Sequence, residues 1–333
     1  MIIPSNRHFQ IQGAGVAGLA IANELVSRGA HISIYDPNGQ PDEHCCSWWA
    51  GGMLAPFCEG ESAEEPVTRL GAKAALWWQK QGVEVTQNGS LVVALARDKT
   101  ELSRFARRTE RHQVVDEGAI TSLEPDLAGR VRHGLFFETE AHLSPRDALA
   151  TLTRKLTKKN ITIRAEAPPQ TTDFAVIDCR GLSAGDALHD LRGVKGEMLV
   201  LHSPDIALSR PIRMLHPRHP LYIVPRGEGI FMLGATQIES SDRKRASVRS
   251  VLELLSAAFA LHPAFGEAEI LEIGVDARPA FPNNLPRIRH IENKIYANGL
   301  FRHGFLLAPA LAEMTADYCL NGIKPELMDE YHG

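Results

Sequence analysis

The opening of the chain carries the clearest periodic pattern of apolar and polar positions. Residues 9–12 alternate and end at a glycine, which is typical of a strand that runs into a tight turn. Residues 16–26 repeat with helical spacing, and the cation and glycine at Arg28 and Gly29 predict where that helix ends. Residues 31–35 alternate again and lead directly to an acid. The pattern predicts a strand, a helix and a second strand in succession.

Glycines with the spacing GxGxxG join the first predicted strand to the helix. Gly13 permits the tight turn, Gly15 lets the backbone approach a pyrophosphate, and Gly18 lets the helix pack closely on the strand. The helix N-terminus offers N–H groups and the positive end of its dipole to phosphates. Asp36, which follows the second strand, can accept hydrogen bonds from both ribose hydroxyls.

This order of elements predicts a dinucleotide site, and the alternative is a glycine-rich turn in some other α/β protein. The acid favours NAD or FAD over NADP and does not choose between the first two. The residues predicted to hold the dinucleotide in this part of the chain are Gly13, Ala14, Gly15, Val16, Ala17, Gly18, Asp36 and Pro37.

The middle of the chain alternates in a way that favours antiparallel strands accompanied by helices. Val248 to Leu261 has the pattern of an amphipathic helix. The clearest predicted strands are Gln87 to Ala94, Glu197 to Leu201, Leu221 to Val224 and Ile230 to Leu233. We find neither an internal repeat nor a low-complexity linker.

The totals exclude several classes of protein. The chain has 333 residues and a formal net charge of -4, so it lacks the basic excess of a nucleic-acid-binding protein. Its five cysteines are irregularly spaced and odd in number, which argues against a disulfide framework. Neither CxxC nor HExxH is present, so no metal site is predicted. The short basic run at residues 243–245, beside Asp242, is interpreted as a solvated turn.

The apolar segment at residues 11–22 raises the alternative of a signal peptide. Three glycines interrupt it, the helical spacing continues to Glu24 and Arg28, and a strand follows at once. No other stretch is apolar for 18 residues or more. We therefore expect no membrane span and a cytoplasmic location.

Four further segments carry motifs that select one family. They read SWWAGGMLAP at residues 47–56, YIVPR followed by LGAT at 222–236, GVDARP at 274–279 and FRHGFLLAPA at 301–310. They resemble, in the same order, the S-x-x-A-G-G-M-L-A-P, Y-I-V-P-R … G-A-T, G-x-R-P and F-R-x-G-I-L-L-A-P-A segments of the D-amino-acid oxidase family. The likeness is to its glycine oxidase branch, and within that branch to the enzymes of thiamine biosynthesis.

The resemblance implies an α/β fold and FAD as the cofactor. A Rossmann-like, glutathione-reductase-like FAD-binding domain would be interleaved with an antiparallel-sheet substrate domain. We expect the FAD-binding domain at residues 1–78, 136–190 and 273–333, and the substrate-binding domain at residues 79–135 and 191–272. Family members are often homo-oligomers, which makes a homo-oligomer the expectation by analogy.

Two of these segments also suit a flavin on physical grounds. Ala50, Gly51 and Gly52 have almost no side chain, so the backbone can pass close to a flat ring, although a flexible loop is the alternative. The N–H groups of residues 304–306 open an apolar helix and can stabilise negative charge on a reduced flavin, although an ordinary strand-to-helix turn is the alternative. The further residues assigned to the cofactor are Cys46, Ser47, Met53, Cys179, Gly181, Arg302, His303, Gly304, Phe305 and Leu306.

The resemblance also assigns the substrate site. Arg278 would bind the carboxylate of an amino acid, since a planar guanidinium suits a carboxylate better than an ammonium does. Tyr222 would donate to the same carboxylate, Arg302 would lie near the pocket mouth, and Met53 would form part of the wall. From the residues alone, Arg278 could be a surface arginine before a proline, and Tyr222 a tyrosine at the edge of the core.

The implied reaction is oxidation of a small amino acid. A hydride would pass from Cα to the flavin, and O2 would reoxidise the flavin and yield hydrogen peroxide. For glycine, the imine would hydrolyse to glyoxylate and ammonia or pass to thiazole synthase. The alternatives are a D-amino-acid or sarcosine oxidase, a dehydrogenase that passes electrons to a quinone, and a flavoprotein that depends on a partner. An NAD-linked reductase is disfavoured because a second GxGxxG is missing.

Four departures from the family pattern affect the expected pocket. Gln237 stands where the pattern often has methionine, and Arg180 occupies a turn expected to pack near FAD. Residues 280–290 lack the usual D-G-x-P-x-I-G, so the family pattern does not predict which residues form the far side of the pocket. Trp48 and Trp49 are larger than usual and would narrow the site toward a small amine.

Overall fold

The structure is a computed structural model that describes residues 8–95, 98–166, 174–216 and 220–329. Among these residues, six strands form a sheet in the order β16-β17-β9-β1-β2-β8. The neighbouring pairs are parallel, except that β16 runs antiparallel to β17 at the edge. The strands are β1 (His8–Gln12), β2 (His31–Tyr35), β8 (Ile163–Arg164), β9 (Ala175–Asp178), β16 (Arg287–Ile291) and β17 (Lys294–Asn298).

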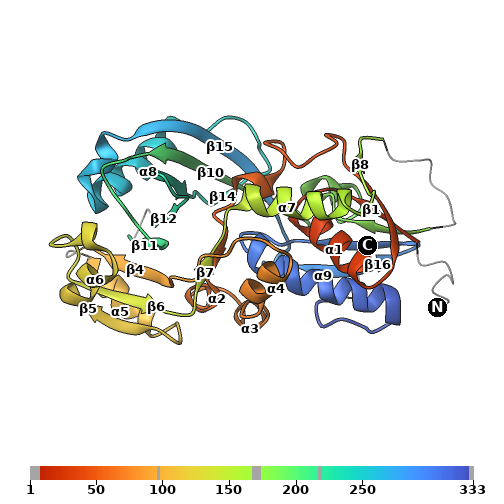
Figure 1. Ribbon diagram of the computed structural model, residues 1–333, viewed down its shortest axis with the longest axis horizontal. Helices are drawn as coiled ribbons and strands as arrows, with labels where there is room; N and C mark the ends of the chain where they lie inside the picture. Colours follow the sequence, from red (N-terminus) through yellow and green to blue (C-terminus); the bar gives the residue numbers. More distant parts are fainter. Residues whose placement is uncertain (1–7, 96–97, 167–173, 217–219, 330–333) are drawn as a thin grey trace.

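Two helices from opposite ends of the sequence pack against each other beside this sheet. They are α1 (Val16–Ser27) and α9 (Gly304–Asn321), and they lie together at one end of the molecule (Figure 1). Both are apolar around most of their circumference, which suits helices that are covered on more than one side. Arg28, which follows α1, forms an ion pair with Asp317 of α9 at 2.5 Å. A third helix, α7 (Pro145–Thr157), packs on α1 from another side.

The second sheet contains nine strands in the part of the chain that the structure describes. Its order is β14-β10-β13-β12-β11-β4-β6-β5. β15 lies outside this order and pairs with β10. All neighbouring pairs are antiparallel except β4 and β11, which agrees with the expected antiparallel sheet. The strands are β4 (Ser90–Ala94), β5 (Gln113–Asp116), β6 (His133–Phe137), β10 (Arg192–His202), β11 (Ile212–Leu215), β12 (Leu221–Pro225), β13 (Ile230–Gly234), β14 (Ile238–Glu239) and β15 (Glu269–Ala280).

Helices and a short ribbon complete the architecture. Helix α8 (Val248–Leu261), which has the bounds predicted for it, packs on β10, β12 and β13. The strands β3 (Met53–Leu54) and β7 (Ala141–His142) pair between the two large sheets. The remaining helices are α2 (Pro56–Glu59), α3 (Glu65–Gly71), α4 (Ala74–Lys80), α5 (Lys99–Ala106) and α6 (Glu117–Leu123).

The predicted elements are present, and the differences lie at their ends. The strand predicted from Gln87 begins only at Ser90, whereas the one predicted at Glu197 to Leu201 extends over Arg192–His202. The strands of the two sheets come from different parts of the chain. The division between these parts lies close to the boundaries proposed for two domains. β15 and β6 each cross one of those boundaries, so the division into domains stays a prediction.

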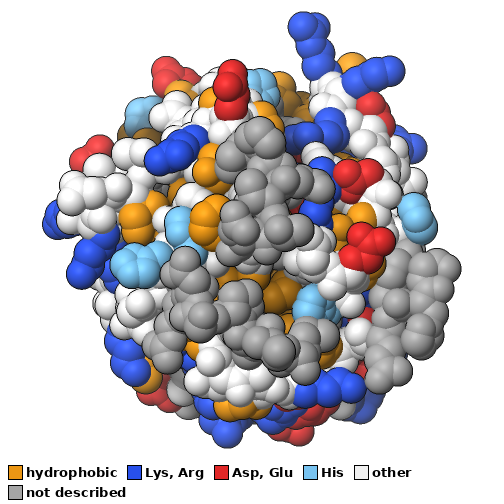
Figure 2. All heavy atoms as spheres, turned by 90° about the vertical axis from the view of Figure 1, so that its right-hand side faces the viewer, with side chains coloured by type: hydrophobic (Ala, Val, Ile, Leu, Met, Phe, Trp, Pro, Cys, Tyr) orange, Lys and Arg blue, Asp and Glu red, His pale blue; other side chains and the backbone are white. Residues whose placement is uncertain are grey.

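Charged side chains of both signs are interspersed on the end of the molecule that Figure 2 presents. No helix in the described ranges is both long and apolar enough to cross a membrane.

Candidate active site

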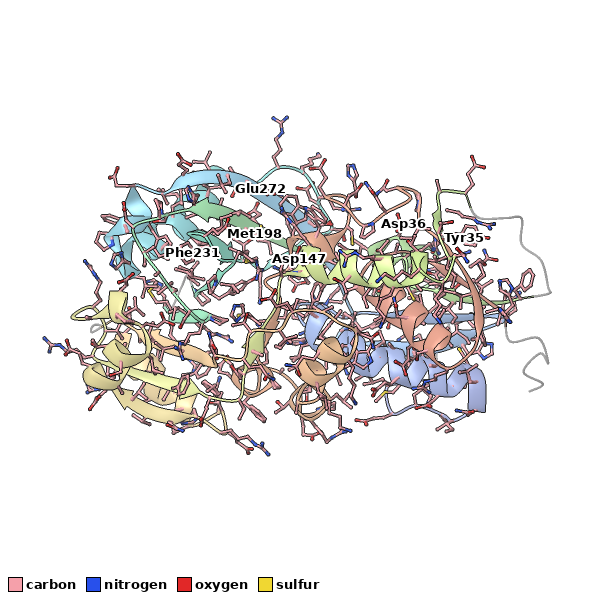
Figure 3. The ribbon with its side chains drawn as sticks, in the orientation of Figure 1. Tyr35, Asp36, Asp147, Met198, Phe231 and Glu272 are labelled. Carbon is pink, nitrogen blue, oxygen red and sulfur yellow. The ribbon has the colours of Figure 1, made fainter. Side chains whose placement is uncertain are left out.

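A cavity of about 550 Å³ lies where the two sheets meet. It extends from Asp36, just beyond β2, to Met198 on β10, and Figure 3 shows these two residues in different halves of the molecule. The segments that follow β1, β2, β9 and β17 all contribute to its lining. Ligands of parallel α/β sheets bind at this carboxyl edge of the strands.

Nearly all of the site residues predicted from the sequence line this one cavity. The exceptions are Ala14 and Gly18, which do not line the cavity but contact residues that do. The Ala14 N–H donates to Asp36 Oδ2 at 2.8 Å, and a Cβ on Gly18 would overlap the carbonyl oxygen of Gly13. The cavity therefore brings together segments that are far apart in the sequence.

The glycine turn has the geometry that a close-fitting ligand requires. Gly13 has φ +97°, and a Cβ there would lie 2.5 Å from the carbonyl oxygen of Cys179. A Cβ on Gly15 would meet only Cys45 Sγ at 3.4 Å and Ser47 Oγ at 3.5 Å. Gly13 and Gly18 are thus required by packing within the protein, whereas Gly15 leaves backbone open to the cavity.

Polar groups surround that turn. Asp36 is held by two backbone N–H groups, since Ala14 donates to Oδ2 and Asn38 donates to Oδ1 at 3.1 Å. Ser47 Oγ accepts from the Val16 N–H at 3.1 Å at the start of α1. Burial raises the pKa of the Cys46 thiol, which keeps this group protonated and able to donate.

These residues fit an FAD molecule. A helix N-terminus without a side-chain cap faces one end of the cavity, and an acid fixed at the end of β2 lies beside it. Farther along, α9 begins at Gly304, as predicted, so its first N–H groups lack partners within the helix. His303 Nδ1 is buried at the cavity with no hydrogen-bond partner among the described residues.

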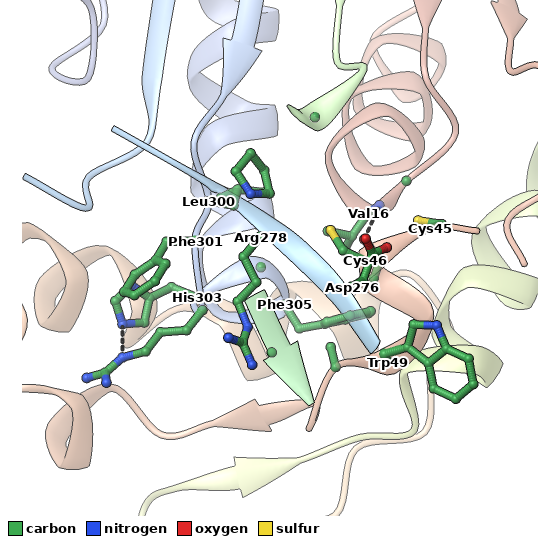
Figure 4. Close-up of a pocket in the computed structure, with 18 of the residues that line it drawn as sticks. Val16, Cys45, Cys46, Trp49, Asp276, Arg278, Leu300, Phe301, His303 and Phe305 are labelled. Atoms are coloured by element: carbon green, nitrogen blue, oxygen red, sulfur yellow. Dashed lines mark hydrogen bonds between the residues drawn. The ribbon is translucent and has the colours of Figure 1, made fainter. Parts of the chain in front are cut away.

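Arg278 enters the cavity from β15 at the other end. A Cβ on Gly196, on the neighbouring strand β10, would overlap the Arg278 guanidinium, so the absence of a side chain there makes room for it. Arg278 Nη1 donates to the carbonyl oxygen of Thr236 at 3.2 Å. No carboxylate of the described chain pairs with this guanidinium, so its other donors can bind an anion. Figure 4 shows Arg278 between the side of the cavity that carries Asp276 and the side that carries His303.

Tyr222 lies between two glycines. A Cβ on Gly234 would lie 2.6 Å from its hydroxyl, and a Cβ on Gly51 would lie 3.0 Å from its ring. Burial raises the pKa of Tyr222, so the hydroxyl stays protonated and can donate. The backbone of Gly51 is in turn fixed by Arg226, whose guanidinium donates to the carbonyl oxygens of Gly51 at 2.8 Å and Leu143 at 2.9 Å.

A buried carboxylate, Glu59, is bound by three basic side chains that line the cavity. Arg302 Nη2 lies 2.8 Å from Glu59 Oε2, His303 Nε2 lies 2.9 Å from the same oxygen, and Arg213 Nη1 lies 3.3 Å from Oε1. Burial alone would raise the pKa of Glu59, but Arg302, His303 and Arg213 together hold it far below its usual range. Glu59 is therefore a permanent anion whose oxygens are occupied, which makes it unsuited to act as a general base.

Glu59 and Arg213 were not predicted from the sequence. Arg213 interrupts the apolar strand β11 (Ile212–Leu215), and an arginine in such a strand is a signal that could have been used. Both residues line the cavity. A second cavity of about 480 Å³ adjoins the first and shares Arg213, Arg302, Gln237, Ala235, Leu221 and Pro220 with it.

The departures from the family pattern have structural explanations. Arg180 pairs with the buried Asp178 at 2.8 Å and with Asp186 at 2.9 Å. Gln237 does line the pocket, and Trp49 does so while Trp48 packs into the neighbouring core. No residue of 280–290 lines the cavity, so that stretch does not form its far side.

A family model described as FAD dependent oxidoreductase matches residues 11–318. The chain belongs to this family, abbreviated DAO, and its cofactor is FAD.

Individual relatives narrow the comparison. The chain is 50% identical to a Rhizobium etli protein assigned to thiamine biosynthesis as the oxidoreductase ThiO, over 92% of this chain and 94% of that protein. It is 26% identical to the bifunctional protein ThiO/ThiG of a Nostoc species over 98% of its own length, but spans 54% of that longer protein. The crystal structure of glycine oxidase from Geobacillus kaustophilus superposes with a TM-score of 0.80, at 23% identity and with 96% of each chain covered.

Proposed function

We propose that this protein oxidises glycine, with sarcosine as a second small substrate, and uses O2 as the electron acceptor. The observation that supports this most directly is the shared cavity, where Arg278, which pairs with no carboxylate of the described residues, and the Tyr222 hydroxyl lie at the end opposite to the glycine turn. The identity to ThiO of Rhizobium etli supports a role in thiamine biosynthesis.

The proposed substrate carboxylate binds to Arg278 and Tyr222. Arg278 supplies a planar donor set, and Tyr222 adds one neutral O–H donor, an arrangement that suits a single carboxylate. When bound, FAD supplies the acceptor for the two electrons that leave Cα and then passes them to O2 as hydrogen peroxide. The protein's task is to hold Cα in place, which fixes the geometry of the reacting atoms.

The amine must react in its neutral form, and no side chain is assigned to deprotonate it. The oxygens of Glu59 are bound by Arg302, His303 and Arg213, and Tyr222 remains protonated because burial raises its pKa. We therefore expect kcat/KM for glycine to increase with pH as the free amine loses its proton. Titration of Tyr222 should cause no decline below about pH 10, the usual pKa of tyrosine.

The imine has a proposed destination as well. The Nostoc relative is a bifunctional protein ThiO/ThiG. We propose that the imine formed here passes to a separate thiazole synthase, and that in the absence of that partner it hydrolyses to glyoxylate and ammonia. A binding experiment with thiazole synthase, with and without glycine, tests this part separately.

Anaerobic mixing of the holoenzyme with glycine, sarcosine and D-alanine tests the proposed reaction. Bleaching of the oxidised flavin band by glycine, with recovery in air, is the expected result. Arg278→Ala should lower the second-order rate constant of bleaching by about a hundredfold or more, since an ion pair with the carboxylate is lost. Arg192→Ala is the matched control, because its guanidinium pairs with Glu239 outside the cavity.

Each other outcome points to a different activity. Faster bleaching by D-alanine than by glycine would favour a D-amino-acid oxidase. Bleaching without recovery in air would favour a dehydrogenase. A flavin that none of the three amines reduces would refute the proposal and favour a flavoprotein that depends on a partner.

A further inference from the structure

Arg243 reaches from an exposed segment to a buried carboxylate. The basic run at 243–245 is exposed, as expected of a solvated turn, but Arg243 Nε donates to Asp276 Oδ1 at 2.5 Å and Nη2 donates to Oδ2 at 3.0 Å. Only 5% of the Asp276 side chain is exposed, compared with 47% for Arg243. The segment is therefore exposed, and Arg243 in addition donates from two nitrogens to one buried carboxylate.

This ion pair lies at the cofactor cavity, and both of its members line it. Asp276 and Arg278 are two residues apart on β15, so both side chains project from the same side of the strand. Figure 4 shows Asp276 on the side of the cavity that carries Cys45 and Cys46. Asp276 and Arg278 thus approach different parts of the same cavity.

Arg243 is also connected to the glycine turn. Its Nη2 donates to the carbonyl oxygen of His44, and its charge acts on the thiols of Cys45 and Cys46. Cys45 in turn is the side chain that a Cβ on Gly15 would meet first, at 3.4 Å. The guanidinium of Arg243 therefore lies near the part of the cavity where the GxGxxG turn would bind a diphosphate, although Arg243 is not part of that motif.

The Arg243 guanidinium also compensates the negative charge of Asp276. A carboxylate near a bound diphosphate repels it, and the repulsion is large where little water intervenes. Burial raises the pKa of Asp276, and the guanidinium of Arg243 opposes that shift and compensates its charge. Without Arg243, the carboxylate would lose the cation that forms an ion pair with it, and the charge of Arg278 would still act on it.

We propose that Arg243 is a cofactor-holding residue that neutralises Asp276 and supplies positive charge to the diphosphate of FAD. The proposal concerns retention of FAD and holds whichever amine is oxidised. It predicts that the two residues are coupled in their effect on FAD affinity.

Equilibrium dialysis of the holoenzyme, with released FAD measured by its fluorescence, tests this coupling at low and high salt. Arg243→Gln should weaken FAD binding about tenfold to a hundredfold at low salt, and the difference should shrink at about 1 M salt because the remaining charges are screened. Asp276→Asn in the same chain should recover most of the loss. Lys244→Gln removes the same charge from the neighbouring exposed position and should change the dissociation constant less than about twofold.

Equal FAD affinity in Arg243→Gln and Lys244→Gln at low salt would overturn the proposal. So would a double variant that binds FAD no better than Arg243→Gln alone. If Arg243→Gln fails to fold, Arg243→Lys serves in its place, and it should show a smaller loss that Asp276→Asn again reverses. The dialysis experiment contains no amine, so it tests FAD retention alone. Failure of glycine to reduce the flavin would therefore contradict only the proposed function.

Discussion

The two ends of the cavity are built in different ways. At the glycine turn, the protein offers mainly backbone, because Gly13, Gly15 and the start of α1 leave little side chain between the chain and a ligand. At the opposite end, the polar groups are side chains, and Arg278 and Tyr222 project from strands of the nine-stranded sheet. On the proposed assignment, the first end binds a part common to many dinucleotides, whereas the second selects the substrate.

This difference determines how each end should respond to mutation. A site made from close backbone approaches is damaged when atoms are added, because the surrounding carbonyl groups cannot move aside. A site made from side chains is damaged when a donor is removed or displaced, and the fold can survive. Three substitutions test these expectations, in decreasing order of expected effect.

Gly18→Ala should have the largest effect. Its Cβ would overlap the carbonyl oxygen of Gly13 and force α1 away from the turn. We expect a loss of about 3 kcal/mol or more in the free energy of unfolding, together with loss of bound FAD. Chemical denaturation and the flavin content of the purified protein measure both effects. Gly185→Ala adds the same methyl group where no heavy atom lies within 4 Å, and a similar loss in that control would contradict the steric explanation.

Glu140→Gln tests a buried carboxyl group that lies behind the substrate end. Glu140 accepts hydrogen bonds from the Cys58 N–H at 2.7 Å and from the Ser90 hydroxyl, and burial raises its pKa to about 7. Because the folded-state pKa exceeds the unfolded value, the group's contribution to stability is complete below about pH 4.5 and is lost as pH rises through 7.

The glutamine variant cannot ionise and should escape this loss. Between pH 5 and pH 8, the free energy of unfolding of the variant should rise relative to the parent by about 2 kcal/mol. Measuring the difference between the two proteins removes the opposing effect of His142, whose pKa burial lowers to about 4. A difference that does not change with pH would show that Glu140 titrates normally.

Gly196→Ala should have the smallest effect and the most selective one. The new methyl group would overlap the guanidinium of Arg278, which can move because it is the end of a flexible side chain. We expect KM for glycine to rise about tenfold, which corresponds to about 1.4 kcal/mol, while FAD affinity is retained. In Gly118→Ala, the added Cβ meets only Asp116 Oδ1, at 3.5 Å, and both quantities should match those of the parent. Loss of FAD in Gly196→Ala would contradict the expectation that the two ends of the cavity respond separately to mutation.

The same contrast explains how much could be predicted from the sequence. The glycine turn, α1 and Asp36 are contiguous, and their spacing follows from local geometry, so the pattern was sufficient to predict them. Arg278 and Tyr222 were assigned through a family resemblance, because nothing in their immediate neighbourhood shows that they share a cavity. The structure brings them together because β15 pairs with the distant strand β10, and β10 is joined to β12 through β13.

The missed residues show what local patterns omit. Glu59 and Arg213 form an ion pair, and neither position reveals the other in the sequence. Arg180 departs from the family pattern at a turn expected to pack near FAD, and Asp178 and Asp186 bind its guanidinium. The roles proposed for the individual site residues stay predictions that the substitutions described here address.

The packing of α1 against α9 has a consequence for how the protein is synthesised. Residues of the glycine turn are synthesised well before the segment 301–306, which lines the same cavity. At about 5–20 residues per second, the interval is on the order of tens of seconds. During that time, the binding site lacks the wall that residues 301–306 form. We therefore expect FAD to be loaded after residues 301–306 have been translated, so the first strand, helix and strand remain without the cofactor until then.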